Sequence, residues 1–322
     1  LYETDQGTRA WDDPNKCELD PQKVKVARAT ELEFFHKRGV YVKVKRSKVT
    51  GKIIKLKWID TNKGDNDHPN YRSRLVGMEF SSGADPENFA STPPIEGLRV
   101  VVSHAATRSR RSRRRHKFMI NDIARAYFNA KIDRDLYVEL PPEDRVEGED
   151  MVGKLELCLY GIQDAARCWQ DLLAAHLSEV GFKRGVGHPC VFHHEDWDVK
   201  TVVHGDDYAS SGPADGLAKL RQALEDKFDI RDTFILGYED GDLREGKVLN
   251  RIVRAGGAGW ELEADPRHAE LLIQQMEMET SKGVVTPGVD QDDAEAGEEE
   301  ELSDREEIKK FRGVAARANY LA

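Results

Sequence analysis

Two short apolar segments, Val199–Val203 and Tyr208–Ser211, flank a turn that contains Gly205, Asp206 and Asp207. Apolar runs on either side of a Gly-containing turn predict the two strands of a β-hairpin. Adjacent carboxylates at such a tip repel each other unless a cation neutralises them, and Mg²⁺ prefers carboxylate oxygen. The hairpin therefore predicts either a metal site or an ordinary solvated acidic turn, and the pair alone does not decide between them.

A third carboxylate ends another predicted strand. The apolar stretch Lys117–Ile123 carries Asp122 near its end and precedes the hairpin in the chain. A strand that ends in Asp, followed by an Asp-Asp hairpin, is the arrangement of a polymerase palm. Such carboxylates bridge two metal ions about 4 Å apart, and phosphoryl transfer needs few other catalytic groups. We therefore predict that Asp122, Asp206 and Asp207 bind two Mg²⁺ ions, with Mn²⁺ as an alternative.

The order of the predicted elements indicates the fold class. Alternating apolar residues in Val40–Val44 and Ile53–Trp58 predict a hairpin, and amphipathic periodicity predicts helices at Glu96–Ala106 and Asp164–Val180. We expect an α+β fold in which helices cover one face of an antiparallel sheet.

The charge distribution indicates which class of partner the chain could bind. The chain has a net charge of −10, and the segment Asp290–Glu307, with eleven acids and one base, accounts for all of it. We read that segment as a solvated linker. A basic cluster lies elsewhere, comprising Arg108, Arg110, Arg111, Arg113, Arg114, Arg115 and Lys117. It predicts a phosphate-contacting patch, or equally a solvated loop.

Other classes of partner find less support. No apolar run approaches the roughly 18 residues of a membrane span, and no leader opens the chain, so we expect neither a membrane nor secretion. The neighbours His188, Cys190, His193 and His194 match no common zinc spacing. We interpret them as a strand end with incidental histidines.

Several motifs together resemble one family, the copia-type (Ty1/copia) retrotransposon reverse transcriptases. Asp122–Phe128 resembles the first catalytic motif of reverse transcriptases, and Leu159–Trp169 resembles the family's Leu-Tyr-Gly-Leu-Lys-Gln-x-x-Arg-x-Trp block. Further segments fit the family in order: Trp58–Asp60, Tyr71–Val76, Phe89–Pro94, Leu136–Pro142 and Phe311–Ala322.

The resemblance implies a right-hand polymerase fold with palm and fingers, and roles for individual residues. Asp122, Asp206 and Asp207 would hold the metals. Tyr127 would lie below the sugar of the incoming nucleotide and exclude a 2′-hydroxyl. The remaining expected nucleotide-binding residues are Arg72, Arg74 and Gln163.

The implied function is RNA-directed DNA synthesis within a retrotransposon polyprotein. The partners would be an RNA template, a DNA primer, deoxynucleoside triphosphates and the integrase and ribonuclease H parts of the polyprotein. The location would be cytoplasmic virus-like particles or the nucleus. The implied division is a lead-in at 1–30, fingers and palm at 31–280, an acidic linker at 281–307 and the start of a connection at 308–322.

Two departures from the family pattern leave alternatives open. His204-Gly205 replaces the usual Tyr-Val, and Gly-Asp-Asp is frequent in viral RNA-dependent RNA polymerases; Tyr127, where those enzymes commonly carry an Asp, favours DNA synthesis. Gln163-Asp164 replaces Lys-Gln, so that one cation is missing. A degenerate or domesticated copy that binds nucleic acid without polymerising is the main alternative. A metal-dependent phosphoesterase using His204 lacks the further ligands it would need.

Overall fold

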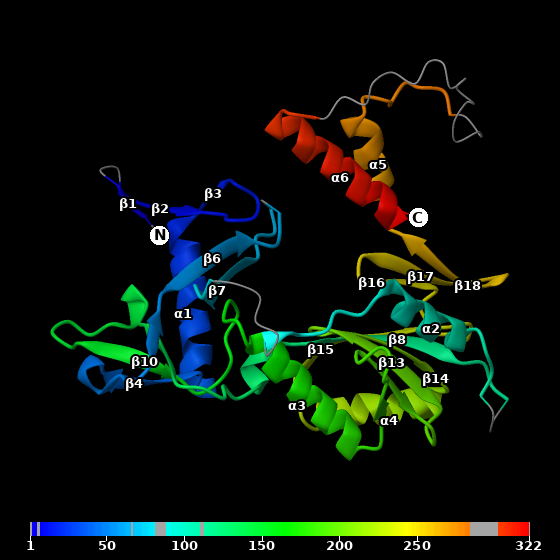
Figure 1. The fold of residues 1–322 in the computed structure, drawn as a ribbon, viewed down its shortest axis with the longest axis horizontal. Helices are drawn as coiled ribbons and strands as arrows, with labels where there is room; N and C mark the ends of the chain where they lie inside the picture. The colour runs from blue at the N-terminus through cyan, green and yellow to red at the C-terminus, as the bar shows by residue number, and fades with distance from the viewer. Residues whose placement is uncertain are drawn as a thin grey trace.

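A six-stranded sheet organises the larger half of the protein (Figure 1). The computed structural model describes residues 2–4, 7–65, 67–80, 88–109, 113–283 and 302–321. Each neighbouring pair of strands in the sheet is antiparallel. In spatial order the strands are β11 (Lys183–Arg184), β12 (Val191–His194), β13 (Val199–His204), β14 (Asp207–Gly212), β8 (Lys117–Ile123) and β15 (Ile230–Leu236). The predicted hairpin is thus β13–β14.

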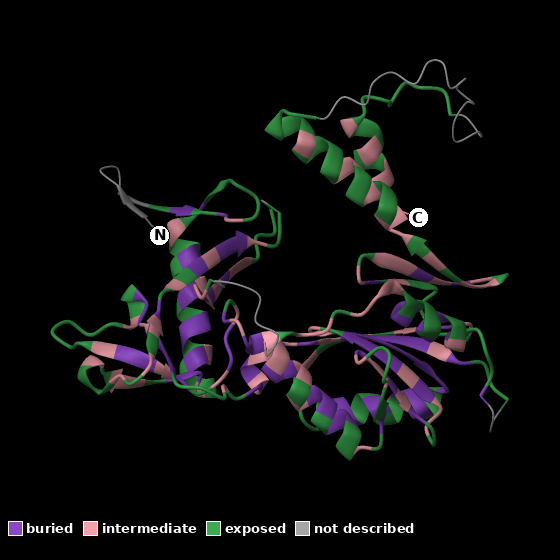
Figure 2. Cartoon of the chain, in the orientation of Figure 1, coloured by how far each residue is buried: buried purple, intermediate pink, exposed green. Residues whose placement is uncertain are grey.

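Alternation along β8 supplies both faces of this sheet with apolar side chains. Met119 joins one core cluster, whereas Phe118 and Ile120 join another. The first cluster includes α3 (Ala165–Glu179) and α4 (Ala214–Glu225). Figure 2 shows buried residues concentrated in this sheet and in the helices below it.

The second face carries a helix as well, which corrects the expectation that helices cover one face only. Here α2 (Ile95–Ala105) packs against the sheet beside a three-stranded sheet of β16 (Glu245–Val248), β17 (Arg251–Gly256) and β18 (Gly259–Ala264). The cause is the alternation of β8, because a strand that is apolar on both sides needs cover on both sides. The α+β class itself is confirmed.

The predicted hairpin between Val40 and Trp58 is wrong. A four-stranded sheet has the order β4 (Tyr41–Lys45), β10 (Met151–Leu155), β9 (Leu136–Glu139) and β5 (Lys52–Ile54), so β4 and β5 lie at its opposite edges. A 3₁₀ turn, Arg46–Lys48, follows β4. Gly51 does not form a hairpin turn but lets the backbone of Asp135 approach closely, because a Cβ at position 51 would lie 2.5 Å from the carbonyl oxygen of Asp135. Partners distant in sequence therefore decide this pairing.

A second hairpin, β6 (Leu56–Asn62) and β7 (Tyr71–Gly77), packs against α1 (Pro21–Arg38). The side chain of Asp20 accepts hydrogen bonds from the N–H groups of Gln22 and Lys23, so α1 begins ten residues before the expected Glu31. The expected lead-in also holds strands β1 (Tyr2–Thr4), β2 (Gly7–Trp11) and β3 (Glu18–Leu19). The described residues of this segment are therefore part of the fold, and the boundary expected at residue 30 falls within α1.

The C-terminal helices α5 (Arg267–Gln275) and α6 (Arg305–Leu321) lie side by side, away from the main sheet (Figure 1). Arg251 of β17 donates to the carbonyl oxygen of Tyr320 at 2.7 Å, which ties α6 to the three-stranded sheet. Most of the acidic segment falls outside the described residues. No described helix has the length and apolar character to cross a membrane.

Candidate active site

Two adjacent strands bring the three predicted carboxylates together. Asp122 on β8 lies opposite Asp207 on β14, and directly opposed residues project from the same face of a sheet. Asp206 occupies the turn before Asp207, and its carbonyl oxygen accepts a 3.0 Å hydrogen bond from the N–H of Ile123. Carboxylates far apart in the sequence thus meet at one end of the sheet.

The geometry of the turn that carries Asp206 explains why residue 205 is a glycine. His204 pairs with Asp207, so the loop holds only two residues, and Gly205 has a φ of +63°. A two-residue loop with positive φ at its first position is typical of a type II′ turn, which selects glycine. The indole N–H of Trp169, a buried residue of α3, donates to the carbonyl oxygen of Gly205 at 2.8 Å. The helix below the sheet therefore fixes the position of the turn.

The electrostatic environment of the carboxylates fits a cation. Burial, together with the charge of Asp206, raises the pKa of Asp122 and of Asp207 above the usual aspartate value. One oxygen of Asp122, Oδ1, is buried without a hydrogen-bond partner among the described residues. A divalent cation would offset both costs, since carboxylate oxygens are the ligands Mg²⁺ prefers.

Sequence reasoning missed Arg231 and Asp232, which flank Asp122 from β15. Asp232 lies opposite Asp122, and the register between β15 and β8 shifts between Ile230 and Asp232. This irregularity redirects Arg231, whose Nη1 lies 2.7 Å from Oδ2 of Asp122. The arginine draws one carboxylate oxygen toward itself, so Asp122 is already partly neutralised. The interrupted alternation in Ile230–Thr233 hid this strand in the sequence.

The two predicted arginines lie together on β7. Arg72 and Arg74 pair with Thr61 and Ile59, so they share one face of the β6–β7 hairpin. Burial lowers the pKa of Arg72, and the nearby cations Arg74, Arg231 and Arg125 add to that effect. Glu31 opposes it, but also forms an ion pair with Arg125 at 2.7 Å. Such a concentration of cations is suited to a polyanionic ligand.

Tyr127 lies in the 3₁₀ helix η3 (Ala126–Asn129), directly after β8. Its ring centroid is 4.7 Å from that of Tyr160, and burial and the charge of Asp206 raise the pKa of both phenols. The guanidinium of Arg74 lies 5.3 Å from the Tyr160 ring centroid. Tyr160, to which sequence reasoning gave no role, therefore connects the arginines to the carboxylate side of the site.

The structure places Gln163 differently from the other predicted residues. Its side-chain amide donates to the carbonyl oxygen of Phe80 at 3.0 Å, and its backbone N–H donates to Glu79 at 3.1 Å. No interaction among the described residues connects it to Asp122, Asp206 or Asp207.

The residue after Gln163 explains the departure from Lys-Gln. Asp164 is buried and accepts two hydrogen bonds from Arg134, each 2.9 Å long. The same guanidinium also contacts both carboxylate oxygens of Glu79. Burial opposes ionisation of Glu79, but hydrogen bonds from Arg134 and from the Gln163 N–H lower its pKa to about 2. Asp164 is therefore part of a structural ion-pair network.

The basic cluster lies at the other end of β8. Lys117 begins the strand, and the five residue steps to Asp122 span about 17 Å. Lys117 itself forms ion pairs of 2.8 Å with Glu239 and Asp242, and Arg115 lies over the ring of Tyr238. Arg110 and Arg111 lie outside the described residues. Any nucleic-acid contact by this cluster would be remote from the carboxylates.

Similarity to known proteins extends over most of the chain. A family model described as reverse transcriptase (RNA-dependent DNA polymerase) matches residues 39–287. The Retrovirus-related Pol polyprotein from transposon TNT 1-94 of Nicotiana tabacum is 28% identical over 280 residues, covering 83% of this chain and 20% of that protein. The Truncated transposon Ty1-A Gag-Pol polyprotein of Saccharomyces cerevisiae is 25% identical, covering 62% of this chain and 17% of that protein. The chain spans about a fifth of the length of these relatives.

Solved structures show more distant similarity. The foamy viral protease-reverse transcriptase dRH in complex with double-stranded DNA has a TM-score of 0.45 and 12% identity, covering 99% of this chain and 44% of that chain. Apo telomerase from Candida Tropicalis has a TM-score of 0.40 and 8% identity, covering 74% of this chain and 60% of that chain. The family assignment therefore rests on the family model and on the polyprotein relatives.

Proposed function

Because this chain belongs to the reverse transcriptase (RNA-dependent DNA polymerase) family, as the copia-type resemblance predicted, we propose that it is the RNA-directed DNA polymerase part of a retrotransposon polyprotein. The observation that carries this proposal is the opposition of Asp122 and Asp207 on adjacent strands, with Asp206 in the turn between β13 and β14. The proposed partners are an RNA template, a DNA primer and deoxynucleoside triphosphates.

The carboxylates would hold two Mg²⁺ ions. When bound, these ions supply positive charge for the triphosphate and acidify the primer 3′-hydroxyl. The raised pKa values of Asp122 and Asp207 and the unpartnered Asp122 Oδ1 support this role. Each of these features costs free energy in an apoprotein and is relieved by a bound cation.

The residues around the carboxylates would orient the incoming nucleotide. Arg72 and Arg74 would bind the triphosphate oxygens, since guanidinium groups donate in pairs to phosphate. Tyr127, which packs on Tyr160 near Asp206, would lie against the sugar and exclude a 2′-hydroxyl. Gln163 would need to release Phe80 before contacting nucleotide or template, so its proposed role is the least direct.

A primer-extension assay on an RNA template with Mg²⁺ tests the proposal. Wild type should extend a DNA primer, and Asp206→Asn should lower the rate at least about a hundredfold, since it removes a metal ligand. Asp240→Asn, an exposed aspartate in a distant turn, serves as the matched control and should retain activity. The polymerase proposal fails if wild type makes no more product than Asp206→Asn.

The same preparation distinguishes the main alternative. A protein that binds primer–template in a gel-shift assay but extends it no faster than Asp206→Asn would be a binding module without polymerase activity. The ion pair between Arg231 and Asp122 is the structural feature that favours this alternative, because it occupies one oxygen of a proposed metal ligand.

A further inference from the structure

A second group of potential ligands lies at the other end of the main sheet. His104 is the penultimate residue of α2, His116 precedes β8, and Asp198 lies between β12 and β13. They line a cavity of about 560 Å³ together with His193, Glu195 and other residues. Their ligand atoms all lie within 4.8 Å of one another. This group is one of two such groups among the described residues.

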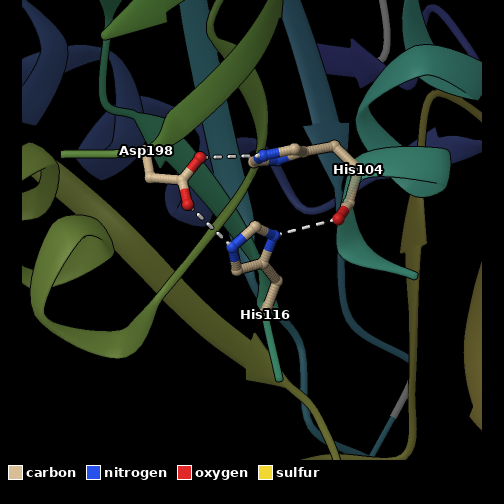
Figure 3. A group of neighbouring side chains, drawn as sticks. All are labelled: His104, His116 and Asp198. Carbon is tan, nitrogen blue, oxygen red and sulfur yellow. Dashed lines mark hydrogen bonds and ion pairs between the residues drawn. The ribbon is translucent and has the colours of Figure 1, made fainter. Parts of the chain in front are cut away.

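The histidines direct the same ring nitrogen toward the same carboxylate (Figure 3). Nε2 of His104 is 3.4 Å from Oδ1 of Asp198, and Nε2 of His116 is 3.2 Å from Oδ2. His116 is 1% exposed, and the side chains of His104 and Asp198 are 10% and 18% exposed. The carboxylate and two imidazole nitrogens thus converge at a largely buried point that opens into the cavity.

The other nitrogen of each ring is fixed by the protein. Nδ1 of His104 lies 2.8 Å from the Ser211 hydroxyl, and Nδ1 of His116 lies 3.0 Å from the carbonyl oxygen of His104. Metal-binding histidines characteristically donate their second ring N–H to such a group, which fixes the tautomer and the orientation.

Two groups contact Nδ1 of His116. The carbonyl oxygen of His104 accepts a hydrogen bond when this nitrogen carries the ring proton, and the Thr107 hydroxyl lies 3.2 Å away. In the tautomer that donates to the carbonyl oxygen, Nε2 of His116 presents its lone pair to Oδ2 of Asp198 at 3.2 Å, and a metal cation between these two atoms would be bound by both.

We propose that His104, His116 and Asp198 bind a divalent transition-metal ion, with Zn²⁺ as the best match. Zn²⁺ takes imidazole nitrogen together with carboxylate oxygen and is commonly four-coordinate, so solvent in the cavity would complete the set. The ion would connect the end of α2, the start of β8 and the β12–β13 turn, and would have a structural role. Lys200 and Glu195 line the same cavity and carry opposite charges.

This site differs from the carboxylate site in place and in chemistry. Asp198 directly precedes β13, whereas Asp206 follows that strand, so the six residues of β13 separate them by roughly 20 Å. The carboxylate site offers only oxygen, whereas this group offers two nitrogens and one oxygen.

The second group within 4.8 Å, Asp133, Asp164 and Cys168, is already neutralised. Arg167 pairs with Asp133 at 2.6 Å, and Arg134 pairs with Asp164 at 2.9 Å. Of the histidines considered in the sequence, His193 lines the same cavity, whereas His194 stacks on Trp197 with a centroid distance of 4.0 Å.

Zn²⁺ binding by the full chain, after removal of metal with a chelator, tests the proposal. Equilibrium dialysis should give about one tightly bound Zn²⁺ per chain for wild type and for Asp206→Asn. Asp198→Asn should weaken binding at least about tenfold, because it removes the only anionic ligand. Asn tolerates the left-handed φ of +52° at this position, so the fold should survive. His188→Gln, at an exposed histidine outside the group, should bind like wild type.

Two further measurements keep the outcome decisive. Zn²⁺ should raise the thermal midpoint of wild type but not of Asp198→Asn, and Co²⁺ should give the visible absorption of a low-symmetry site in wild type only. If the Asp198→Asn protein does not fold, the His104→Gln protein is measured in its place. Equal Zn²⁺ affinity in wild type and these variants would overturn the proposal. So would a wild type that binds no Zn²⁺.

Discussion

Individual residues at the carboxylate site are arranged at a cost to stability. Asp207 is half-buried beside Asp206 and opposite Asp122, and like charges directly opposed across strands are destabilising. Such costs are typical of functional positions, where a ligand recovers them. The three carboxylates were predictable from the sequence because each ends or follows an apolar strand, whereas Arg231 was not, because a register shift directs it to Asp122.

Substituting Asp207→Asn should stabilise the protein in the absence of divalent cations. Burial and the charges of Asp206 and Asp122 raise the pKa of Asp207 above its ordinary value of 3.8. The folded state therefore holds the proton more tightly than the unfolded state, and this group's contribution to stability falls as pH rises through the raised pKa. Thermal midpoints measured with a chelator should be higher for Asp207→Asn than for wild type at neutral pH.

The difference between these proteins should shrink as the pH falls below the ordinary carboxyl pKa, where Asp207 is protonated in both states. Asp240→Asn, at an exposed position, should follow wild type throughout. A wild type as stable as Asp207→Asn at neutral pH would contradict the assigned cost.

Substituting Tyr127→Ala should increase the incorporation of ribonucleotides relative to deoxynucleotides, roughly tenfold or more, by removing the ring beside the sugar. Tyr127→Phe keeps the ring and its packing on Tyr160, so it should retain the wild-type preference. Single-nucleotide incorporation with matched ribo- and deoxyribonucleotides measures the ratio. A ratio that is the same in wild type and Tyr127→Ala would remove Tyr127 from the proposed role.

For individual helices and strands, the sequence pattern predicted the element correctly where that element carries its own hydrophobic periodicity. The predicted strand Lys117–Ile123 is β8, and the predicted helices correspond to α2 and α3. Pairing failed where the partner is distant in sequence, because β4 joins β10 and β5 joins β9 instead of each other. Hydrophobic alternation indicates a strand but does not identify its neighbour.

The register shift in β15 leads to a prediction about Arg231. Its guanidinium competes with a metal ion for Oδ2 of Asp122 at 2.7 Å. Arg231→Gln should lower the Mg²⁺ concentration needed for half-maximal primer extension, by up to about fivefold, the range expected for a partly exposed ion pair. Arg221→Gln removes an exposed arginine of α4, paired with Glu225, and should leave the Mg²⁺ dependence unchanged.

A Mg²⁺ requirement that stays the same in Arg231→Gln would show that the ion pair does not compete with the metal. A higher requirement would mean that Arg231 supports the site by keeping Asp122 ionised.

Across the whole molecule, the proposed site joins two parts of the fold. The carboxylates belong to the six-stranded sheet, whereas Arg72 and Arg74 belong to the β6–β7 hairpin that packs on α1. The family resemblance identified both parts in the sequence. It did not show that the described part of residues 1–30 helps build the second part, because the mixed polarity of this segment hid three short strands and the start of α1.

This arrangement predicts a specific kinetic effect of Arg72→Gln. The substitution should raise KM for the deoxynucleoside triphosphate at least about tenfold, since a guanidinium pairing with phosphate is lost. Binding of primer–template should change much less. Arg99→Gln, at an exposed position on α2, is the matched control. An unchanged KM in Arg72→Gln would exclude Arg72 from the triphosphate site.

The two-metal carboxylate site is tested most directly by counting Mn²⁺ ions bound by the protein–primer–template complex with a non-hydrolysable deoxynucleotide. Electron paramagnetic resonance of free Mn²⁺ gives this number. We predict that wild type binds two more ions than Asp122→Asn/Asp206→Asn, and that Asp240→Asn matches wild type. The same number of bound ions in wild type and in the doubly substituted protein would contradict the assignment of Asp122, Asp206 and Asp207 as the metal ligands.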